Sequence, residues 1–132
     1  MSNLTDEDLE LLRGRNFAHV AVIRPDGSPH VTVTWIDGSW DHVLVNTAAG
    51  RVKDRYVRAD PRVSVTVHDQ ADPYRWHRYD GVVERFVTGE EAEEHIDALC
   101  RRYNGKPWTY KDGQVRVLYR IRPTRILRRY DG

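Results

Sequence analysis

The chain has 132 residues, a length that accommodates one domain with its own hydrophobic core but not two. Its 21 Lys and Arg residues nearly balance 20 Asp and Glu residues, which argues against a protein that coats nucleic acid through a large basic excess. The single cysteine, Cys100, excludes an internal disulfide and fits a reducing compartment. With no signal-peptide pattern and no apolar run of membrane-spanning length, we expect a cytoplasmic protein without membrane or nucleic-acid partners.

The first half of the chain predicts a short helix followed by three strands. Thr5 and Asp8 have the spacing of a capping box at the start of the helix, and Gly14 ends it. The strands that follow are rich in Val, Thr and Ile, are separated by Pro-Asp-Gly-Ser and Asp-Gly turn sequences, and span residues 17–23, 30–36 and 42–47. Three consecutive strands joined by short turns predict an antiparallel meander.

The second half predicts two helices and further strands. One helix is predicted at 51–59, and Thr88 with Glu91 predicts a second capping box for another. One face of the helix at 51–59 carries Val52, Tyr56 and Ala59. The remaining strands are predicted at 63–67, at 74–86 with a bulge at Gly81, at 115–121 ending at Pro123, and as an edge strand at 125–130. About six mostly antiparallel strands, short helices and no βαβ pattern predict a mainly β (α+β) fold of the small-barrel type, in one domain over 1–132.

The most informative stretch runs from the third predicted strand into the helix that follows. The strand turns at Gly50 and continues into a helix start that carries Arg51, Lys53 and Arg55. Basic side chains at a helix N-terminus, where backbone N–H groups point outward, suit an anion such as phosphate. A solvated basic helix face is the alternative. His30 opens the second strand, where it either adds a donor to the same anion or lies at the surface.

The sequence contains little evidence for other kinds of functional site. The six histidines include no pair at metal-ligand spacing, and the chain lacks a Gly-x-Ser-x-Gly elbow, so we expect neither a metal site nor a Ser-His-Asp hydrolase. Among the four tryptophans we place Trp76 near a ligand. We assign Trp35, Trp40 and Trp108 to core or interface packing.

Six stretches of the chain follow one another in an order that is typical of a known family. They span residues 17–30, 43–53, 60–63, 72–76, 81–83 and 96–103. On these stretches the sequence resembles the split β-barrel flavin and deazaflavin oxidoreductases, the superfamily of pyridoxamine phosphate oxidase. Within that superfamily it is similar to the small branch that uses the deazaflavin coenzyme F-420. The resemblance implies a split-barrel fold and a homodimer with two cofactor sites at the subunit interface.

The resemblance also implies which residues bind the cofactor. Arg51 and Lys53 hold the phosphate, with Arg55 in support, and Val52 lies between them in the same cofactor-binding segment. The other implied positions are His30 and Thr32 as pocket lining, Asn46, Thr47 and Ala48 at the ribityl chain or ring, and Trp76 as a closing residue, from the partner chain. The chain departs from the usual family pattern at 32–35 and 55–57, which changes the strand-edge geometry and one polar cofactor contact.

The implied activity is hydride transfer from reduced F-420 to a small unsaturated or aromatic acceptor, with no protein nucleophile and no catalytic residue that we name. Arg24, Arg58 and Arg78 are candidates to hold the acidic glutamyl tail that F-420 has and FMN lacks. The alternatives are an FMN-dependent enzyme of the pyridoxamine phosphate oxidase type, a cofactor-binding protein without turnover, and haem binding through a histidine.

Overall fold

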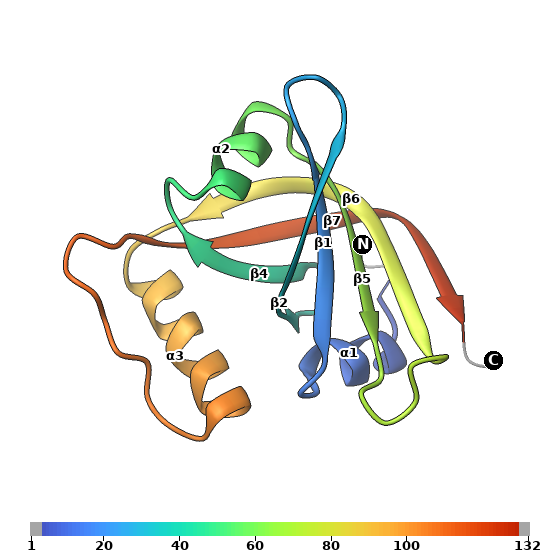
Figure 1. Ribbon diagram of the computed structural model, residues 1–132. Coiled ribbons are helices and arrows are strands. Elements are labelled where there is room, and N and C mark those ends of the chain that lie inside the picture. Colours follow the sequence, from blue (N-terminus) through green and yellow to red (C-terminus); the bar gives the residue numbers. More distant parts are fainter. Residues whose placement is uncertain (1–3, 130–132) are drawn as a thin grey trace.

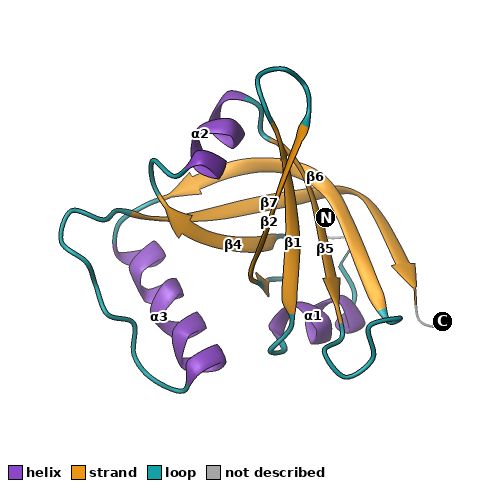
Figure 2. Ribbon diagram, viewed as in Figure 1, coloured by secondary structure: helices purple, strands orange, loops and turns teal. Residues whose placement is uncertain are grey.

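The computed structural model of the protein describes residues 4–129, which form a strongly curled antiparallel sheet with three helices around it (Figures 1 and 2). The strands are β1 (Phe17–Ile23), β2 (Pro29–Trp35), β3 (Asp37–Gly38), β4 (Val43–Ala48), β5 (Arg62–His68), β6 (Trp76–Val87) and β7 (Arg116–Arg129). The helices are α1 (Asp6–Arg13), α2 (Val52–Ala59) and α3 (Glu90–Asn104). This architecture confirms the predicted mainly β fold class. None of the described helices has the length and apolar character needed to cross a membrane.

The order of strands in the sheet is β2-β1-β5-β6-β7-β4-β3, so the predicted meander of the first three strands is wrong. β2 pairs only with β1, whereas β4 pairs with β7 over Val43–Ala48. Because β7 follows β4 by about seventy residues in sequence, local turn signals do not reveal this pairing. The Asp37-Gly38 sequence forms the two-residue β3 itself, rather than a turn. The curl nevertheless brings β2 close to β4, which creates a groove between them.

β7 is one strand of 14 residues, so the predicted end at Pro123 and the separate edge strand at 125–130 are wrong within the described residues; Tyr130 lies outside them. The strand continues because Pro123 pairs with Gly81 at a register shift, a position where proline costs no regular ladder hydrogen bond. The predicted bulge at Gly81 is confirmed. A Cβ atom on Gly81 would lie 2.3 Å from the backbone oxygen of Arg122, so the bulge requires glycine.

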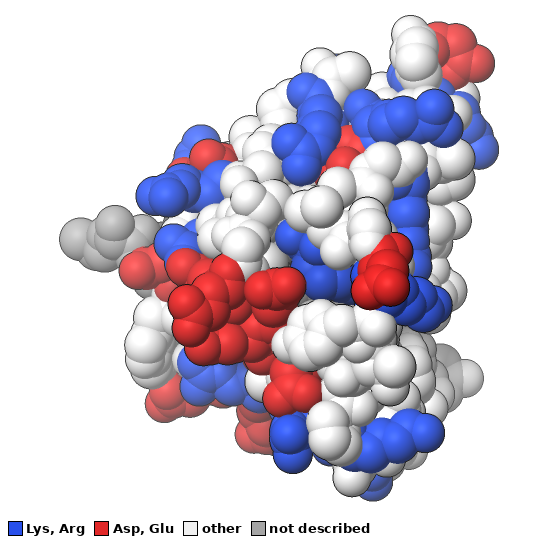
Figure 3. Space-filling model, turned by 90° about the vertical axis from the view of Figure 1, so that its left-hand side faces the viewer, with Lys and Arg blue, Asp and Glu red and all other residues white. Residues whose placement is uncertain are grey.

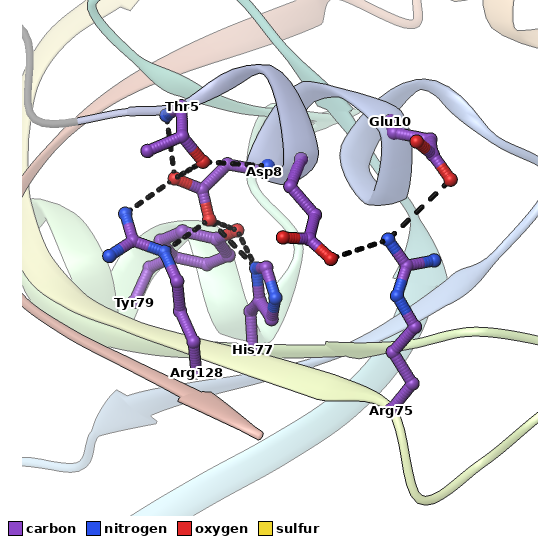
Figure 4. A network of polar contacts seen from close by, with 8 residues as sticks. Thr5, Asp8, Glu10, Arg75, His77, Tyr79 and Arg128 are labelled. Carbon is purple, nitrogen blue, oxygen red and sulfur yellow. Dashed lines mark hydrogen bonds and ion pairs between the residues drawn. The ribbon is translucent and has the colours of Figure 1, made fainter. Parts of the chain in front are cut away.

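The predicted capping box of α1 is confirmed, and its carboxylate anchors the helix to the sheet. Thr5 N donates to Asp8 Oδ2 at 2.8 Å, and Asp8 N donates to Thr5 Oγ1 at 3.2 Å. The same carboxylate accepts from His77 and Tyr79 of β6 and from Arg128 of β7 (Figure 4). α1 is thereby held across two strands that are distant from it in sequence.

The predicted capping box at Thr88 is wrong, because the N-cap of α3 is Gly89 at φ +82° and makes no side-chain cap bond. The end of α3 is as expected, since Gly105 takes the left-handed conformation. Cys100 is buried on this helix. The core inside the curled sheet consists mainly of Val, Ile, Leu and Tyr side chains, among them Tyr79 and Tyr119.

Candidate functional site

A groove lies between β2, the end of β4 and the start of α2. One part of it, the Lys53 hollow, has a volume of about 290 Å³ and is lined by His30, Thr32, Val33, Thr34, Asn46, Thr47, Arg51, Val52 and Lys53. The adjoining part, the Arg116 hollow, has a volume of about 330 Å³ and is lined by Phe17, Val33, Thr34, Trp35, Asn46, Arg51, Ile96, Trp108 and Arg116. The two hollows share four lining residues and therefore form one continuous groove.

The turn from β4 into α2 is pinned by the Asp54 carboxylate. Gly50, at φ +85°, reverses the chain, and its N–H donates to Asp54 Oδ2 at 3.0 Å. Tyr119 Oη donates to Asp54 Oδ1 at 2.6 Å, and Arg58 Nε donates to Oδ2 at 3.0 Å. Burial raises the pKa of Asp54, but the hydrogen bonds from Tyr119, Gly50 and Arg58 outweigh it and lower that pKa overall. The carboxylate is thus ionised and fully engaged within the protein.

As a result, the face of α2 that is buried differs from the face that the sequence predicts. Lys53, Asp54 and Val57 are the buried residues of the helix, whereas Val52 is 42% exposed. The predicted face of Val52, Tyr56 and Ala59 is therefore not the buried one. The reason is that the Asp54 carboxylate accepts a hydrogen bond from Tyr119 of β7, which turns this side of the helix toward the sheet.

Lys53 carries a buried charge that forms no ion pair with any described residue. Lys53 is only 8% exposed. No carboxylate in the described part of the chain forms an ion pair with its ammonium group. Burial, followed by the nearby positive charges of Arg51 and Arg116, lowers the pKa of Lys53 to about 8, while Asp54 acts in the opposite direction. Such a group is stabilised when an anion enters the groove.

Two hydroxyl groups beside Lys53 also lack partners. Thr32 Oγ1 and Thr47 Oγ1 are buried and form no hydrogen bond to any described residue. A buried hydroxyl without a partner is costly, and both hydroxyls can donate to a ligand oxygen. Together with the Lys53 ammonium and the Arg51 guanidinium, they form a donor set that suits phosphate oxygens.

The Arg116 hollow combines a second buried cation with flat aromatic surface. Arg116 is 5% exposed, and burial, followed by the charge of Arg51, lowers its pKa to about 10. Its guanidinium lies 4.9 Å from the Trp108 ring centre. Trp35 also lines this hollow and stacks on Tyr103, with ring centres 5.1 Å apart. Figure 3 looks onto the side of the molecule on which α3 lies; acidic side chains form one contiguous patch there, and basic side chains are spread over the rest of this face.

Seven of the ten predicted cofactor-binding residues line the Lys53 hollow, and they are His30, Thr32, Asn46, Thr47, Arg51, Val52 and Lys53. Ala48 is buried at the end of β4 and lines neither hollow. Arg55 is exposed one helical turn further on, again outside both. Trp76 lies with His19 and Pro73 in a separate hollow. The structure brings the seven together; their contact with a cofactor stays a prediction.

The sequence interpretation missed Arg116, Trp35 and Trp108 as groove residues. Trp35 and Trp108 were assigned to packing, yet both line the Arg116 hollow. No local sequence pattern indicates that Arg116 lies in the groove, because its position opposite Ala48 depends on the long-range pairing of β4 with β7. Within the described residues no group of three or more His, Cys, Asp or Glu side chains is arranged to hold a metal ion.

Of the three arginines predicted for an acidic tail, only Arg24 lies beside the groove. Its Nη2 is 3.5 Å from His30 Nδ1, at the edge of the Lys53 hollow. Arg58 is engaged by Asp54 and by the ring of Phe86. Arg78 forms an ion pair on β6 and lines the hollow that holds Trp76.

Comparison with known proteins identifies the family and the fold of the chain. The family model described as pyridoxamine 5'-phosphate oxidase matches residues 4–130. Among solved structures, an F-420 reductase is 28% identical with a TM-score of 0.80, over 94% of this chain and 98% of that one. A conserved hypothetical protein of Mycobacterium tuberculosis is 26% identical with a TM-score of 0.76, over 96% and 84%.

A third solved structure, described as a pyridoxamine 5'-phosphate oxidase of Listeria innocua, is 17% identical with a TM-score of 0.71, over 93% of this chain and 95% of that one, and shows the shared fold alone. No curated protein matches the sequence. The predicted split-barrel fold is confirmed by these likenesses. Since the family model spans nearly the whole described chain, the protein belongs to the pyridoxamine 5'-phosphate oxidase family, whose members bind flavin-type cofactors and include oxidoreductases.

Proposed function

We propose that the protein is an oxidoreductase that binds the deazaflavin coenzyme F-420 in the groove and reduces a small unsaturated or aromatic compound. The observation that carries the proposal is Lys53, a buried ammonium that forms no ion pair with the described residues, beside Arg51 and two threonine hydroxyls that likewise have no partner among those residues. These groups fit a phosphate ester. The F-420 reductase that is 28% identical supports the choice of coenzyme.

Each part of the groove then has a separate task. Arg51, Lys53, Thr32 and Thr47 would hold the phosphate, while the walls of the Arg116 hollow offer flat surface for a planar ring. When bound, the deazaflavin supplies the hydride. The protein's own groups bind and orient the two reactants and keep water from the groove. In this scheme the chain supplies no nucleophile, and we name no proton donor.

The choice of F-420 over FMN has one further support in Arg24. FMN ends at its phosphate, whereas F-420 continues into an acidic glutamyl tail. Arg24 lies 3.5 Å from His30 at the edge of the Lys53 hollow, where such a tail would leave the groove. A charge-assisted contact at this point would favour F-420.

We also propose that the protein acts as a cytoplasmic homodimer with the groove at the subunit interface. β2 is an edge strand of the sheet, and Val31 and Val33 on it are 56% and 60% exposed. Val33 also lines the groove, so a partner that covered this edge would complete the site. Light scattering at increasing protein concentration tests the dimer.

The proposal is tested by titrating the protein with F-420 and with FMN and following tryptophan fluorescence, since Trp35 and Trp108 line the groove. The Arg51→Ala/Lys53→Ala variant should weaken F-420 binding by at least about 100-fold, because each charge-assisted contact contributes roughly 1.5–3 kcal/mol. Arg62→Ala is the matched control, because Arg62 is exposed and pairs only with Asp60 among the described residues.

The outcomes separate the alternatives. Tight F-420 binding followed by oxidation of reduced F-420 in the presence of an acceptor supports the proposed reductase. A preference for FMN assigns the protein to an FMN-dependent activity instead. Tight F-420 binding with no acceptor reduced across a broad panel favours a cofactor-binding protein without turnover. Binding of neither compound overturns the proposal.

A further inference from the structure

The Asn46 amide, which lines both hollows, is held in one orientation. Its Nδ2 donates to the backbone oxygen of Ala92 at 2.9 Å and to His95 Nδ1 at 3.1 Å. Its Oδ1 accepts from Arg116 Nε at 3.0 Å. A flipped amide would set its oxygen against the Ala92 oxygen and its NH₂ group against the Arg116 N–H, so the flipped form is excluded.

This orientation determines the state of His95. Since Asn46 Nδ2 donates to His95 Nδ1, that nitrogen carries a lone pair, and the ring proton sits on Nε2. His95 Nε2 then donates to Asp37 Oδ2 at 2.9 Å, and Arg102 Nη2 donates to Asp37 Oδ1 at 2.9 Å. A continuous chain of hydrogen bonds therefore leads from Asp37 through His95 and Asn46 to Arg116.

We propose that His95 is a positioning residue: in its neutral form it fixes the Asn46 amide, and Asn46 in turn aims the Arg116 guanidinium at an anionic group in the groove. His95 lines neither the Lys53 hollow nor the Arg116 hollow, so it acts only through Asn46. It faces a separate hollow behind α3. The inference rests on the proposed function, because the direction of Arg116 matters only if the groove takes an anion.

Protonation of His95 breaks this chain. A proton on Nδ1 would face the Asn46 N–H, so that two donors meet without an acceptor. The Asn46 amide would then keep only the Ala92 oxygen as an acceptor among the described residues and would hold Arg116 less firmly, while Arg116 Nη1 keeps its bond to Gln114 Oε1 at 3.2 Å. The charged and titratable groups around His95 are Asp37 on β3, Arg102, Glu91 and Glu94 on α3, Asp41 and His42 in the β3–β4 turn, and Arg120 on β7. Protonation of His95 should therefore lower the affinity of the groove for an anion.

Two variants separate the contacts of His95. In His95→Asn the side-chain oxygen takes the place of Nδ1 and still accepts from Asn46, but the contact with Asp37 is lost. In His95→Gln the amide nitrogen takes the place of Nε2 and still donates to Asp37, but nothing accepts from Asn46. Neither variant titrates between pH 5 and 8.

The experiment measures the F-420 dissociation constant of the wild type and both variants from pH 5.5 to 7.5. We expect wild-type affinity, relative to His95→Asn, to fall about fivefold toward pH 5.5, the effect of one neutral hydrogen bond. His95→Gln should bind about fivefold more weakly than His95→Asn at every pH. His30 also lines the groove, but it is present in all three proteins, so its contribution cancels in the comparison. Equal binding by the two variants, or parallel pH profiles for all three proteins, overturns the proposal.

A second measurement does not depend on the cofactor. The ¹⁵N resonance of Arg116 Nε–H should move between pH 7.5 and 5.5 in the wild type, because protonation of His95 disturbs Asn46, and it should stay constant in His95→Asn. If the wild type binds no F-420 at any pH, the proposed function fails while this measurement still decides whether His95 controls Arg116. An Arg116 resonance that does not move in the wild type overturns the proposal.

Discussion

Replacing Asp8 by asparagine should detach α1 from the sheet, because every contact of this carboxylate is with a donor. Oδ1 accepts from His77 Nδ1 at 2.7 Å, from Tyr79 Oη at 2.7 Å and from Arg128 Nε at 3.0 Å (Figure 4). Oδ2 accepts from Thr5 N at 2.8 Å and from Arg128 Nη2 at 2.6 Å. An amide would set its NH₂ group against donors on one of these two sides.

The expected loss in the free energy of unfolding is about 3–5 kcal/mol, the cost of breaking a buried, hydrogen-bonded charge pair from one side. For a chain of this length, that loss lowers the melting temperature by roughly 10 °C or more. The control is Asp6→Asn, because Asp6 is an exposed carboxylate in the first turn of the same helix. That variant should lose at most about 1 kcal/mol of helix-dipole stabilisation.

The pH dependence of stability gives an independent check. Burial raises the pKa of Asp8, but hydrogen bonds from His77, Arg128, Thr5 and Tyr79 outweigh it and hold that pKa well below its usual range. A carboxyl whose pKa is lower in the folded state contributes stability above its unfolded pKa, near 3.9, and loses it as the pH falls further. Thermal melts should therefore show a steeper decline below about pH 4 in the wild type than in Asp8→Asn. Equal slopes, or equal losses in Asp8→Asn and Asp6→Asn, would refute the reasoning.

Two further predictions concern the groove. Because the pKa of Lys53 is lowered to about 8, the affinity of the wild type for F-420 should fall about tenfold between pH 7 and 9. Lys53→Arg should show no such fall. Fluorescence titrations with F-420 at both pH values test this prediction. Tyr119→Phe removes the 2.6 Å donor to Asp54 and should cost about 1.5–3 kcal/mol in chemical unfolding and weaken F-420 binding, since Asp54 pins the turn at Gly50. The exposed Tyr74→Phe is its control, and equal stability of the two variants would contradict the role of Tyr119.

Local chemistry made much of the fold predictable from sequence. The Thr5–Asp8 capping box, the positive φ of Gly50 and Gly105, and the bulge at Gly81 each follow from residues that are neighbours along the chain. The strand-to-helix turn that carries Arg51 and Lys53 is of the same kind. For this reason seven predicted site residues converge on one hollow.

What the sequence did not reveal depends on pairing between distant segments. Local turns predict that consecutive strands are neighbours, yet β4 pairs with β7, and this pairing places Arg116 in the groove. The inward face of α2 is likewise set by the contact of Asp54 with Tyr119, 65 positions away in sequence. Trp76 was placed near the ligand by its sequence neighbours alone, and in the single chain it lies in another hollow.

The groove also predicts a conflict between stability and binding. A pKa of Lys53 lowered from 10.5 to about 8 means that the charged ammonium costs the folded protein about 3 kcal/mol at neutral pH, at 1.36 kcal/mol per unit. Lys53→Met keeps most of the side-chain volume and removes this charge, so the ligand-free protein should melt at a higher temperature than the wild type. The same variant should lose most of the increase in melting temperature that F-420 gives the wild type. If Lys53→Met is instead less stable without ligand, the ammonium has a counter-charge in the folded protein, and the argument that an anion completes this site is wrong.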